Sequence, residues 1–325
     1  MSAVLVVRPS SLGDLVYAMA LVADLRAHRP DLAVDWVAEE SFAPVVAMNK
    51  NIRRVIPVAL RRWRARMHRP STWREFREFR RALRGERYLA ILDLQEQVKG
   101  AILARIARGV RHGLDRANIR EPIATLLHDA HHAIDKRQHF VVRSRALAAA
   151  ALGYTLDHAP SFGLAAPPPS AADIAPPGRY LVFFHATSRR EKLWPEAHWR
   201  ALARHLTNAG YAVLLPWGTD DEHARSKRIA EGIAGAIVPP RQPLTALASV
   251  IARACGVVGV DTGLVHLAAA LGTPTIALFT ATDPALAGVA VAGAHACDLG
   301  AEGRVPAPEA VADRLDEQMA RDAAR

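Results

Sequence analysis

Short apolar runs alternate with amphipathic stretches through most of the chain. An apolar run followed by an amphipathic helix is the pattern of a βα unit, and repeated units build a parallel sheet covered by helices. In the first half, the pattern predicts strands at 3–8, 33–38, 54–58 and 89–94, with helices at 14–28, 73–84 and 97–108. In the second half, it predicts strands at 180–185, 212–216, 236–238, 257–260 and 275–279, with helices at 195–208, 220–231, 244–254, 262–271 and 308–323. The sequence therefore predicts an α/β protein.

A proline-rich stretch separates the two series of strands. Residues 166–178 hold five prolines, and proline fits neither a helix interior nor a central strand. The stretch predicts a linker between two domains, residues 1–165 and 166–325, each a doubly wound parallel sheet with its own core. The C-terminal helix could pack back on the first domain. In such sheets, ligands bind beyond the carboxyl ends of the strands.

The excess of positive over negative charge lies in the first domain. The net charge of the chain is +10, of which residues 1–165 carry +11 and residues 166–325 carry −1. Residues 61–87 alone contain eleven arginines and three glutamates. A field of this sign attracts a polyanion, which could be nucleic acid, an anionic membrane surface, or a phosphorylated and carboxylated substrate. For residues 74–87, an ordinary solvated helix face is the alternative.

Cysteine usage and the apolar runs indicate the compartment. Cys255 and Cys297 are the only cysteines and form no CxxC pair, which argues against a structural zinc or a disulfide framework and favours a reducing cytoplasm. The apolar residues 3–7 run directly into Arg8, and the stretch 255–279 is interrupted by polar residues and a proline. We therefore expect neither a signal peptide nor a spanning helix.

The first strand-to-helix turn, RPSSLGD at residues 8–14, places Asp14 at the start of a helix. A helix N-terminus favours a carboxylate, so Ser11 or Asp14 could simply cap the helix. The turn also lies at the carboxyl end of the first strand, where an ionised aspartate can accept a proton from a hydroxyl group. It lacks the GxGxxG pattern, which leaves a dinucleotide site unsupported.

The segment VVGVDTGLVHLAAALGTPTIALF at 257–279 is the most informative one. A buried strand ends in Asp261 and a helix begins at once, so the backbone N–H groups of Thr262 and Gly263 predict an anion site. His266 lies about one turn further along the helix and can face the same site. A single histidine is more often a structural residue, but the neighbouring Asp261 and Thr262 favour a functional role.

Two further turns carry candidate ligand contacts. HATSRREKLWP at 185–195 offers the hydroxyl groups of Thr187 and Ser188, and Lys192 as a mobile cation suited to a diphosphate. These residues could instead cap the next helix, and the turn lacks the glycines of a Walker loop. Glu222 follows another strand and could receive ribose hydroxyls, or it could complement a helix dipole.

A histidine-rich segment, HDAHH at 128–132, raises the question of a metal. If the segment is helical, His128 and His132 lie on one face, as in some zinc sites; a helix or a loop is expected. No cysteine or carboxylate pattern accompanies them, and the surrounding cations suit an anion better: Arg120, Lys136, Arg137 and Arg143. We therefore predict no metal site here.

Four of these segments resemble the ADP-heptose:lipopolysaccharide heptosyltransferases: PSSLGD at 9–14, HATSRREKLWPEAHW at 185–199, PWGTDDEHARSKRIAEG at 216–232 and VDTGLVHLAAALGTPTIALFTATDP at 260–284. IPVALRRWR at 56–64 and GLDRANIREPIA at 113–124 are similar to the heptosyltransferase I branch. The resemblance runs nearly end to end, although the residues after Pro284 match poorly. It implies a GT-B fold of two Rossmann-like domains, the first binding the acceptor and the second binding ADP-heptose.

The resemblance also implies roles for particular residues. Asp14 matches the general base. The sugar-nucleotide site would hold Thr187, Ser188, Lys192, Glu222, Asp261, Thr262, Gly263 and His266. The anionic acceptor surface would hold Arg61, Arg62, Arg64, Arg120 and Arg143. The implied reaction uses no metal and no other cofactor. Ser188 and Val265 stand where a threonine and a serine are more usual.

The implied function is inverting transfer of heptose from ADP-heptose to a Kdo residue of Kdo-lipid A, the first heptose of the lipopolysaccharide inner core. The charge distribution agrees, since Kdo carboxylates, lipid A phosphates and an anionic membrane face would all attract the first domain. We expect a cytoplasmic enzyme, peripheral on the inner membrane, with no nucleic-acid partner. Two alternatives stay open: an ADP-heptose transferase with a heptosylated core or protein acceptor, and a non-enzymatic nucleic-acid-binding protein, for which no binding motif is found.

Overall fold

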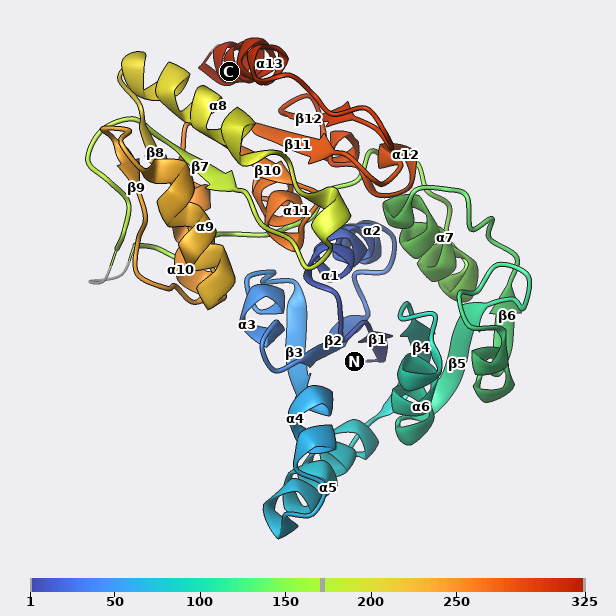
Figure 1. The fold of residues 1–325 in the computed structure, drawn as a ribbon. Helices are drawn as coiled ribbons and strands as arrows, with labels where there is room; N and C mark the ends of the chain where they lie inside the picture. Colours follow the sequence, from blue (N-terminus) through green and yellow to red (C-terminus); the bar gives the residue numbers. More distant parts are fainter. Residues whose placement is uncertain (1, 170–172, 324–325) are drawn as a thin grey trace. The chain divides into compact units, whose positions relative to one another are not determined.

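The computed structural model describes residues 2–169 and 173–323, and packing divides the chain into two compact units, Met1–Leu164 and Ala165–Arg325 (Figure 1). The described part of the proline-rich stretch contains no helix or strand. Residues 170–172 of the predicted linker lie outside the described residues. Across the described ranges, no helix combines the length and the apolarity needed to cross a membrane.

The first unit is a six-stranded parallel sheet in the order β3-β2-β1-β4-β5-β6. Its strands are β1 (Ala3–Val7), β2 (Ala33–Glu39), β3 (Ile52–Val58), β4 (Arg87–Asp93), β5 (Arg108–Leu114) and β6 (Ala130–His132). Its helices are α1 (Leu12–Ala18), α2 (Ala20–His28), α3 (Ala43–Val46), α4 (Leu60–Ala65), α5 (Pro70–Arg84), α6 (Val98–Ile106), the 3-10 helix η1 (Pro122–Leu127) and α7 (Phe140–Leu152).

The second unit is also a six-stranded parallel sheet, in the order β12-β11-β10-β7-β8-β9. Its strands are β7 (Tyr180–Phe184), β8 (Ala212–Leu214), β9 (Ala236–Ile237), β10 (Gly256–Val260), β11 (Thr275–Phe279) and β12 (Ala296–Gly300). Its helices are η2 (Arg190–Lys192), α8 (Glu196–Asn208), α9 (Asp220–Ala230), α10 (Leu244–Ile251), α11 (Gly263–Ala270), α12 (Pro284–Ala287), η3 (Ala290–Ala292) and α13 (Pro308–Ala323).

The two sheets share one connectivity. In each unit the first three strands run outward from the centre in one direction, and the next three run outward in the other. The strand order therefore reverses between β1 and β4 in the first unit and between β7 and β10 in the second. This reversal is the topological switch point of a doubly wound sheet, where the loops after the two central strands separate and leave room for a ligand.

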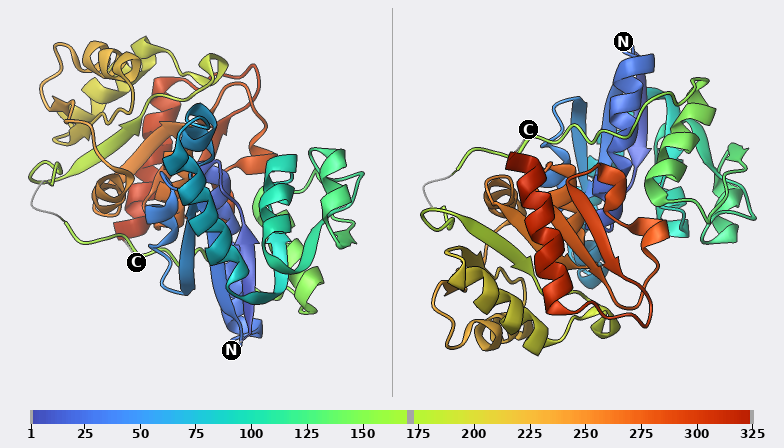
Figure 2. Two further views of the ribbon diagram at one scale, coloured as in Figure 1. Left: turned by 90° about the horizontal axis from the view of Figure 1, so that it is seen from below. Right: turned by 90° about the horizontal axis from the view of Figure 1, so that it is seen from above.

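The α/β architecture predicted from the sequence is confirmed, and each of the nine predicted strands is present with ends within two residues of the expected ones. The prediction missed β5, β6, β12 and helix α7. The expectation of a helix or loop around HDAHH was wrong in part, because His131 and His132 belong to the edge strand β6. The C-terminal helix α13 packs against α8, β10 and β11 within the second unit, where it crosses one face of the sheet (Figure 2).

Continuous apolar strands make the centre of each sheet. All residues of β1 (AVLVV) and β10 (GVVGV) are buried, as expected for parallel strands covered on both faces. In the first core, Leu5 of β1 belongs to the same cluster as Phe79 and Leu83 of α5. In the second core, Phe183 of β7 joins Trp199 of α8, whose ring centroid lies 4.9 Å away.

A buried ion pair joins α2 to α7 in the first unit. The Arg145 guanidinium donates to both carboxylate oxygens of Asp24, each at 2.8 Å. Asp24 has no exposed side-chain surface, and Arg145 keeps 7% of its own. A pair this deep fixes the relative position of two helices, because either charge alone would be left without solvent or partner.

Asp24→Asn should lower the stability of the first unit by about 3 kcal/mol or more, because it leaves the Arg145 charge buried without a counter-ion. Asp31→Asn is the matched control: Asp31 pairs with Arg29 at the surface, where solvent screens the charges, so its loss should barely change the transition. Urea unfolding followed by circular dichroism measures both. Equal transitions for the two variants would contradict a structural role for the buried pair.

Candidate functional site

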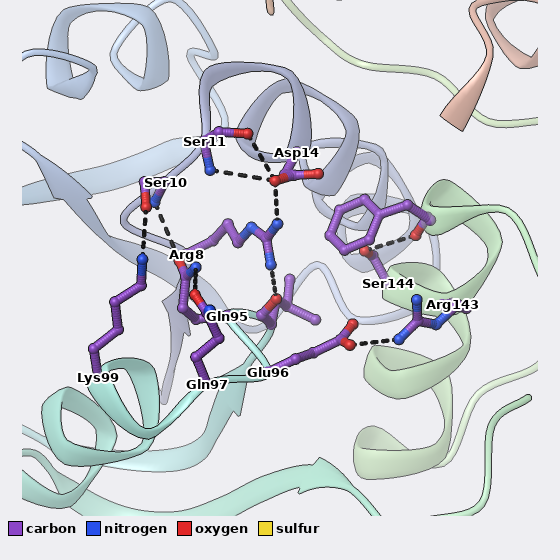
Figure 3. A network of polar contacts seen from close by, with 12 residues as sticks. Arg8, Ser10, Ser11, Asp14, Gln95, Glu96, Gln97, Lys99, Arg143 and Ser144 are labelled. Carbon is purple, nitrogen blue, oxygen red and sulfur yellow. Dashed lines mark hydrogen bonds and ion pairs between the residues drawn. The ribbon is translucent and has the colours of Figure 1, made fainter. Parts of the chain in front are cut away.

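Two loops at the switch point of the first unit bring polar side chains together (Figure 3). One loop follows β1 and contains Ser10, and the other follows β4 and contains Gln95. The Ser10 backbone N–H donates to Gln95 Oε1 at 3.2 Å, which links the two loops. The Gln95 backbone N–H donates to Asp93 Oδ1 at 2.9 Å, at the end of β4. The loop before α1 is thus held against the loop after β4.

Asp14, in the first turn of α1, is bound through one carboxylate oxygen (Figure 3). Its Oδ2 accepts from Ser11 Oγ at 2.8 Å and from the Ser11 backbone N–H at 3.3 Å, and it lies 2.6 Å from Arg8 Nη2. Its Oδ1 accepts no hydrogen bond from any residue that the structure describes. The side chain keeps 39% of its surface exposed. One oxygen is therefore fixed, and the other is available to a ligand hydroxyl.

Arg8 is the cation behind Asp14. Its guanidinium is buried, donates to the Leu94 carbonyl, and lies over the Phe140 ring with Cζ 4.5 Å from the ring centroid. Burial raises the pKa of Asp14, but the Arg8 charge and the Ser11 hydrogen bonds outweigh burial and hold that pKa below its usual value. Asp14 is therefore ionised at neutral pH and able to accept a proton.

Three further cations lie beside this carboxylate or face the same loops. Lys99, in the first turn of α6, donates to Ser10 Oγ at 3.3 Å. Burial lowers the pKa of Lys99, and the charges of Arg8, Arg61 and Arg120 lower it further, which places these groups near one another. Arg61 and Arg120 are exposed, and neither forms an ion pair with a described residue. Together with Lys99 they make an accessible cationic cluster.

Arg143, on α7, is already paired. Its Nη2 donates to Glu96 Oε2 at 2.6 Å, and both side chains are largely buried. Glu96 lies in the loop after β4 and adopts a φ of +58°, in a region that costs most residues energy. Burial raises the pKa of Glu96, although the Arg143 charge opposes the shift. Arg143 therefore secures this loop through Glu96.

Arg62, which the resemblance assigns to the acceptor surface, already has carboxylate partners in the structure. Its guanidinium pairs with Glu40 and with Glu75, both at 2.8 Å, and Trp63 Nε1 also donates to Glu75 at 2.8 Å. An arginine held by two carboxylates has few donors left for a ligand. Arg64, on the same helix, is exposed, and no contact of the described residues connects it with Asp14.

The second unit has its own polar cluster at its switch point, centred on Asp261 at the end of β10. Lys192, which follows β7, places Nζ 2.5 Å from Asp261 Oδ2. Thr282, in the loop after β11, donates to the same oxygen at 2.8 Å. His266 Nε2 lies 3.5 Å from Asp261 Oδ1, and the Thr187 hydroxyl donates to the Asp261 carbonyl at 3.3 Å. The structure thus brings four of the predicted residues together.

Asp261 positions the cation of this cluster. Burial raises the pKa of Asp261, but its contacts with His266 and Lys192 outweigh burial and hold the pKa far below the usual value. The carboxylate is therefore always charged near neutral pH, and it holds the Lys192 ammonium beside the start of α11. Thr262 is the N-cap residue of that helix and makes no side-chain capping bond, and Gly263 is its first residue. The free N–H groups there suit an anion.

Ser188 and Glu222 lie outside the Asp261 cluster. Ser188 is exposed. Glu222 Oε2 accepts from the backbone N–H of Gly218 at 2.7 Å and of Thr219 at 3.3 Å, which closes a capping box at the start of α9. Glu222 therefore acts as a helix-start residue through Oε2. Its other oxygen, Oε1, is available to a ligand hydroxyl.

The histidine-rich segment does not form the shared face that a helix would give. His128 Nε2 lies 2.9 Å from Asp93 Oδ2 in a fully buried pair. His132 Nε2 lies instead 3.1 Å from His112 Nδ1, on the neighbouring strand. The two imidazoles turn to different partners because only His132 belongs to β6, whereas His128 is the C-cap residue of the 3-10 helix η1.

Four site residues were not predicted from the sequence: Arg8, Gln95, Lys99 and Thr282. Arg8 stands in the same turn as Asp14, and a charged residue directly after a buried strand was a usable signal. Gln95 and Lys99 follow β4, whose place beside β1 depends on the strand order. Thr282 follows β11 and reaches Asp261 across the neighbouring loop, which no local pattern reveals.

Comparison with known proteins now identifies the family. Residues 76–307 match the model of glycosyltransferase family 9 (heptosyltransferase). The chain belongs to this family. It is 43% identical to lipopolysaccharide heptosyltransferase 1 of Escherichia coli K12 over 88% of this chain and 90% of that protein. It is 41% identical to the heptosyltransferase 1 of Pseudomonas aeruginosa over 88% of this chain and 80% of that protein.

Solved heptosyltransferases have the same fold. The E. coli heptosyltransferase WaaC with ADP matches with a TM-score of 0.87 and 39% identity, over 97% of this chain and 99% of that chain. The E. coli ADP-heptose heptosyltransferase II matches with a TM-score of 0.77 at 22% identity, which shows the fold alone. The chain is a glycosyltransferase of the heptosyltransferase family with the GT-B type of fold.

Asp14→Asn should lower turnover by about 10²-fold or more, because an amide cannot accept the proton that a general base removes. The protein should still fold and bind nucleotide. Ser11→Ala is the matched variant: it removes one hydrogen bond to Oδ2 but keeps the carboxylate, so turnover should fall far less. Steady-state kinetics and thermal unfolding of both variants separate chemistry from capping. Wild-type turnover in Asp14→Asn, with a lower Tm alone, would leave Asp14 as a helix cap.

Proposed function

We propose that this heptosyltransferase moves heptose from ADP-heptose to a Kdo residue of Kdo-lipid A, with inversion at the anomeric carbon. The observation that carries the proposal is the Asp14 carboxylate, ionised and bound on one oxygen only, beside the cationic cluster of Lys99, Arg61 and Arg120. A base next to positive charge suits an acceptor hydroxyl on an anionic sugar. The identity to heptosyltransferase 1 of two organisms supports the same acceptor.

The first unit would bind the acceptor. The Kdo hydroxyl approaches Oδ1 of Asp14, and the carboxylate takes its proton as the hydroxyl oxygen attacks the anomeric carbon of heptose. Arg61, Arg120 and Lys99 bind the Kdo carboxylate and the lipid A phosphates, for which the guanidinium fork is well shaped. Arg143 holds the loop after β4 through Glu96. Arg62 is assigned to the Glu40 and Glu75 pairs rather than to the acceptor.

The second unit would bind ADP-heptose. The diphosphate lies against Lys192 and the backbone N–H groups at Thr262 and Gly263, where negative charge develops as ADP leaves. Thr187, Ser188 and His266 contribute further polar contacts, and Glu222 offers its second oxygen to a ribose hydroxyl. The solved E. coli WaaC structures with ADP and with ADP-2-deoxy-2-fluoro heptose support a donor of this kind.

No metal ion is needed in this scheme, because Lys192 and the start of α11 supply the positive charge that a divalent ion would otherwise bring to the leaving diphosphate. The enzyme would act at the cytoplasmic face of the inner membrane as a peripheral protein. The arginines of α5, from Arg74 to Arg84, would draw the first unit toward anionic lipid without binding one specific group.

Lys192→Gln should weaken ADP binding by roughly tenfold or more, since a hydrogen bond to a charged group contributes about 1.5–3 kcal/mol. Lys227→Gln is the control: Lys227 is an exposed lysine on α9 of the same unit. Calorimetric titration with ADP in the presence of EDTA measures both, and the wild-type enzyme should bind ADP and turn over in that buffer. Loss of wild-type activity on EDTA treatment would contradict the metal-free scheme.

Arg61→Lys and Arg120→Lys should each raise the acceptor KM several-fold while donor KM stays constant, because lysine keeps the charge but loses the bidentate fork. Arg62→Lys should leave acceptor KM unchanged. The assay uses Kdo-lipid A and, in parallel, a monoheptosylated acceptor. Transfer to the heptosylated acceptor alone would favour the other ADP-heptose transferase activity, and an unchanged acceptor KM in both Arg61→Lys and Arg120→Lys would place the acceptor elsewhere.

A further inference from the structure

A second group of titratable side chains in the first unit lies at the C-terminal end of α2. His28 is the last residue of that helix, and Asp157 and His158 follow α7 by a few residues. His28 Nε2 lies 3.3 Å from Asp157 Oδ1, and His158 Nδ1 lies 2.8 Å from the same oxygen. One ligand atom from each of the three residues falls within 4.8 Å of the other two. Two imidazole nitrogens and a carboxylate oxygen therefore converge on one point.

Neighbouring side chains hold the two imidazole rings of this cluster in place. His158 Nε2 lies 3.0 Å from Asp24 Oδ1, and Asp24 is fixed by its buried pair with Arg145. The His28 ring stacks on Tyr154, with centroids 5.0 Å apart and 11° between the planes. A histidine whose far nitrogen donates to a carboxylate is the usual arrangement in protein metal sites, because the carboxylate sets the ring orientation and the tautomer.

We propose that His28 Nε2, Asp157 Oδ1 and His158 Nδ1 bind one divalent zinc ion, with Asp24 orienting His158. Nitrogen and carboxylate ligands lie about 2.0–2.1 Å from zinc, and tetrahedral ligands at that distance are roughly 3.4 Å apart. The His28–Asp157 separation of 3.3 Å already matches this value, and the 2.8 Å between His158 and Asp157 would widen slightly when the ion replaces the proton. The ion takes the place of the proton on His158 Nδ1, which leaves to solvent. A water molecule completes the coordination.

The surroundings favour a cation despite the arginines nearby. The charges of Arg145 and Arg29 are each matched by an aspartate, Asp24 and Asp31. The carbonyl end of α2 adds a partial negative charge. The Asp157 side chain is 66% exposed, which gives an ion direct access from solvent.

The site goes beyond the transferase activity and takes no part in it. It would connect the end of α2 to the segment after α7, two parts of the first unit that are far apart in the sequence. The ion would stabilise the folded first unit by binding it in preference to the unfolded chain. The sequence contains no spacing signal for such a site, because its ligands come from distant segments.

The test is zinc titration of the full-length, tag-free protein after treatment with a chelator, by isothermal calorimetry with thermal unfolding in parallel. We expect one equivalent of Zn²⁺ to bind and the Tm to rise. His28→Gln and Asp157→Asn should each lower the affinity at least tenfold and remove the Tm increase. His68→Gln and Asp313→Asn, which change exposed residues outside the cluster, should bind zinc as the wild type does.

Three results would overturn the proposal. The first is no saturable binding of zinc to the wild-type protein. The second is unchanged affinity in both His28→Gln and Asp157→Asn. The third is binding that survives these substitutions and is lost in His132→Gln, which would assign the ion to the His112 and His132 pair. Because calorimetry and Tm report on the ion directly, none of these outcomes depends on whether the proposed sugar transfer is correct.

Discussion

The reversal of strand order at the centre of each sheet is the constraint on which both polar clusters depend. β1 and β4 are neighbours, yet the chain leaves them in opposite directions, and α1 starts at the point where the strand order reverses. β7 and β10 repeat this arrangement around the start of α11. A single geometric rule thus provides two binding positions, each at a helix N-terminus. The side chains at the two positions differ: the first holds the Asp14 carboxylate and the second holds the Lys192 ammonium.

Each cluster uses an ion pair to set the charge of its working group. In the first unit, Arg8 is buried and Asp14 is half exposed, so the pair leaves the carboxylate facing outward. In the second, Asp261 and Lys192 are both largely buried, and Lys192 reaches the carboxylate from the loop after β7. In the first pair, Arg8 holds the carboxylate that would meet the substrate. In the second pair, Asp261 holds the ammonium that would meet the substrate. Such pairing orients a charged group before the ligand arrives, which reduces the reorganisation that binding requires.

Local patterns predicted the central strands and the junctions that follow them, and they failed where contacts are long-range. Asp14 and Asp261 were found because each carboxylate stands where a buried strand passes into a helix. β5 and β6 were missed because RGVRHGL and AHH lack an apolar run. The capture of Arg62 by Glu40 and Glu75 depends on how α4 and α5 pack near the end of β2, which arginine content alone does not encode. Gln95 and Lys99 belong to the site because the strand order places β4 beside β1, and local sequence patterns do not reveal that order.

The uneven bonding of Asp14 also bears on which product is made. Oδ2 is occupied by Ser11 and Arg8, so a hydroxyl can lose its proton only along the direction of Oδ1. A sugar acceptor presents several hydroxyls of nearly equal acidity, and a symmetrically exposed carboxylate would not distinguish them. A carboxylate with one usable oxygen does, because only the hydroxyl that lies on that single line is activated. Under the proposed mechanism, the regiochemistry of the new glycosidic bond would depend on the contacts of Asp14 with Ser11 and Arg8, two residues that need not touch the sugar at all.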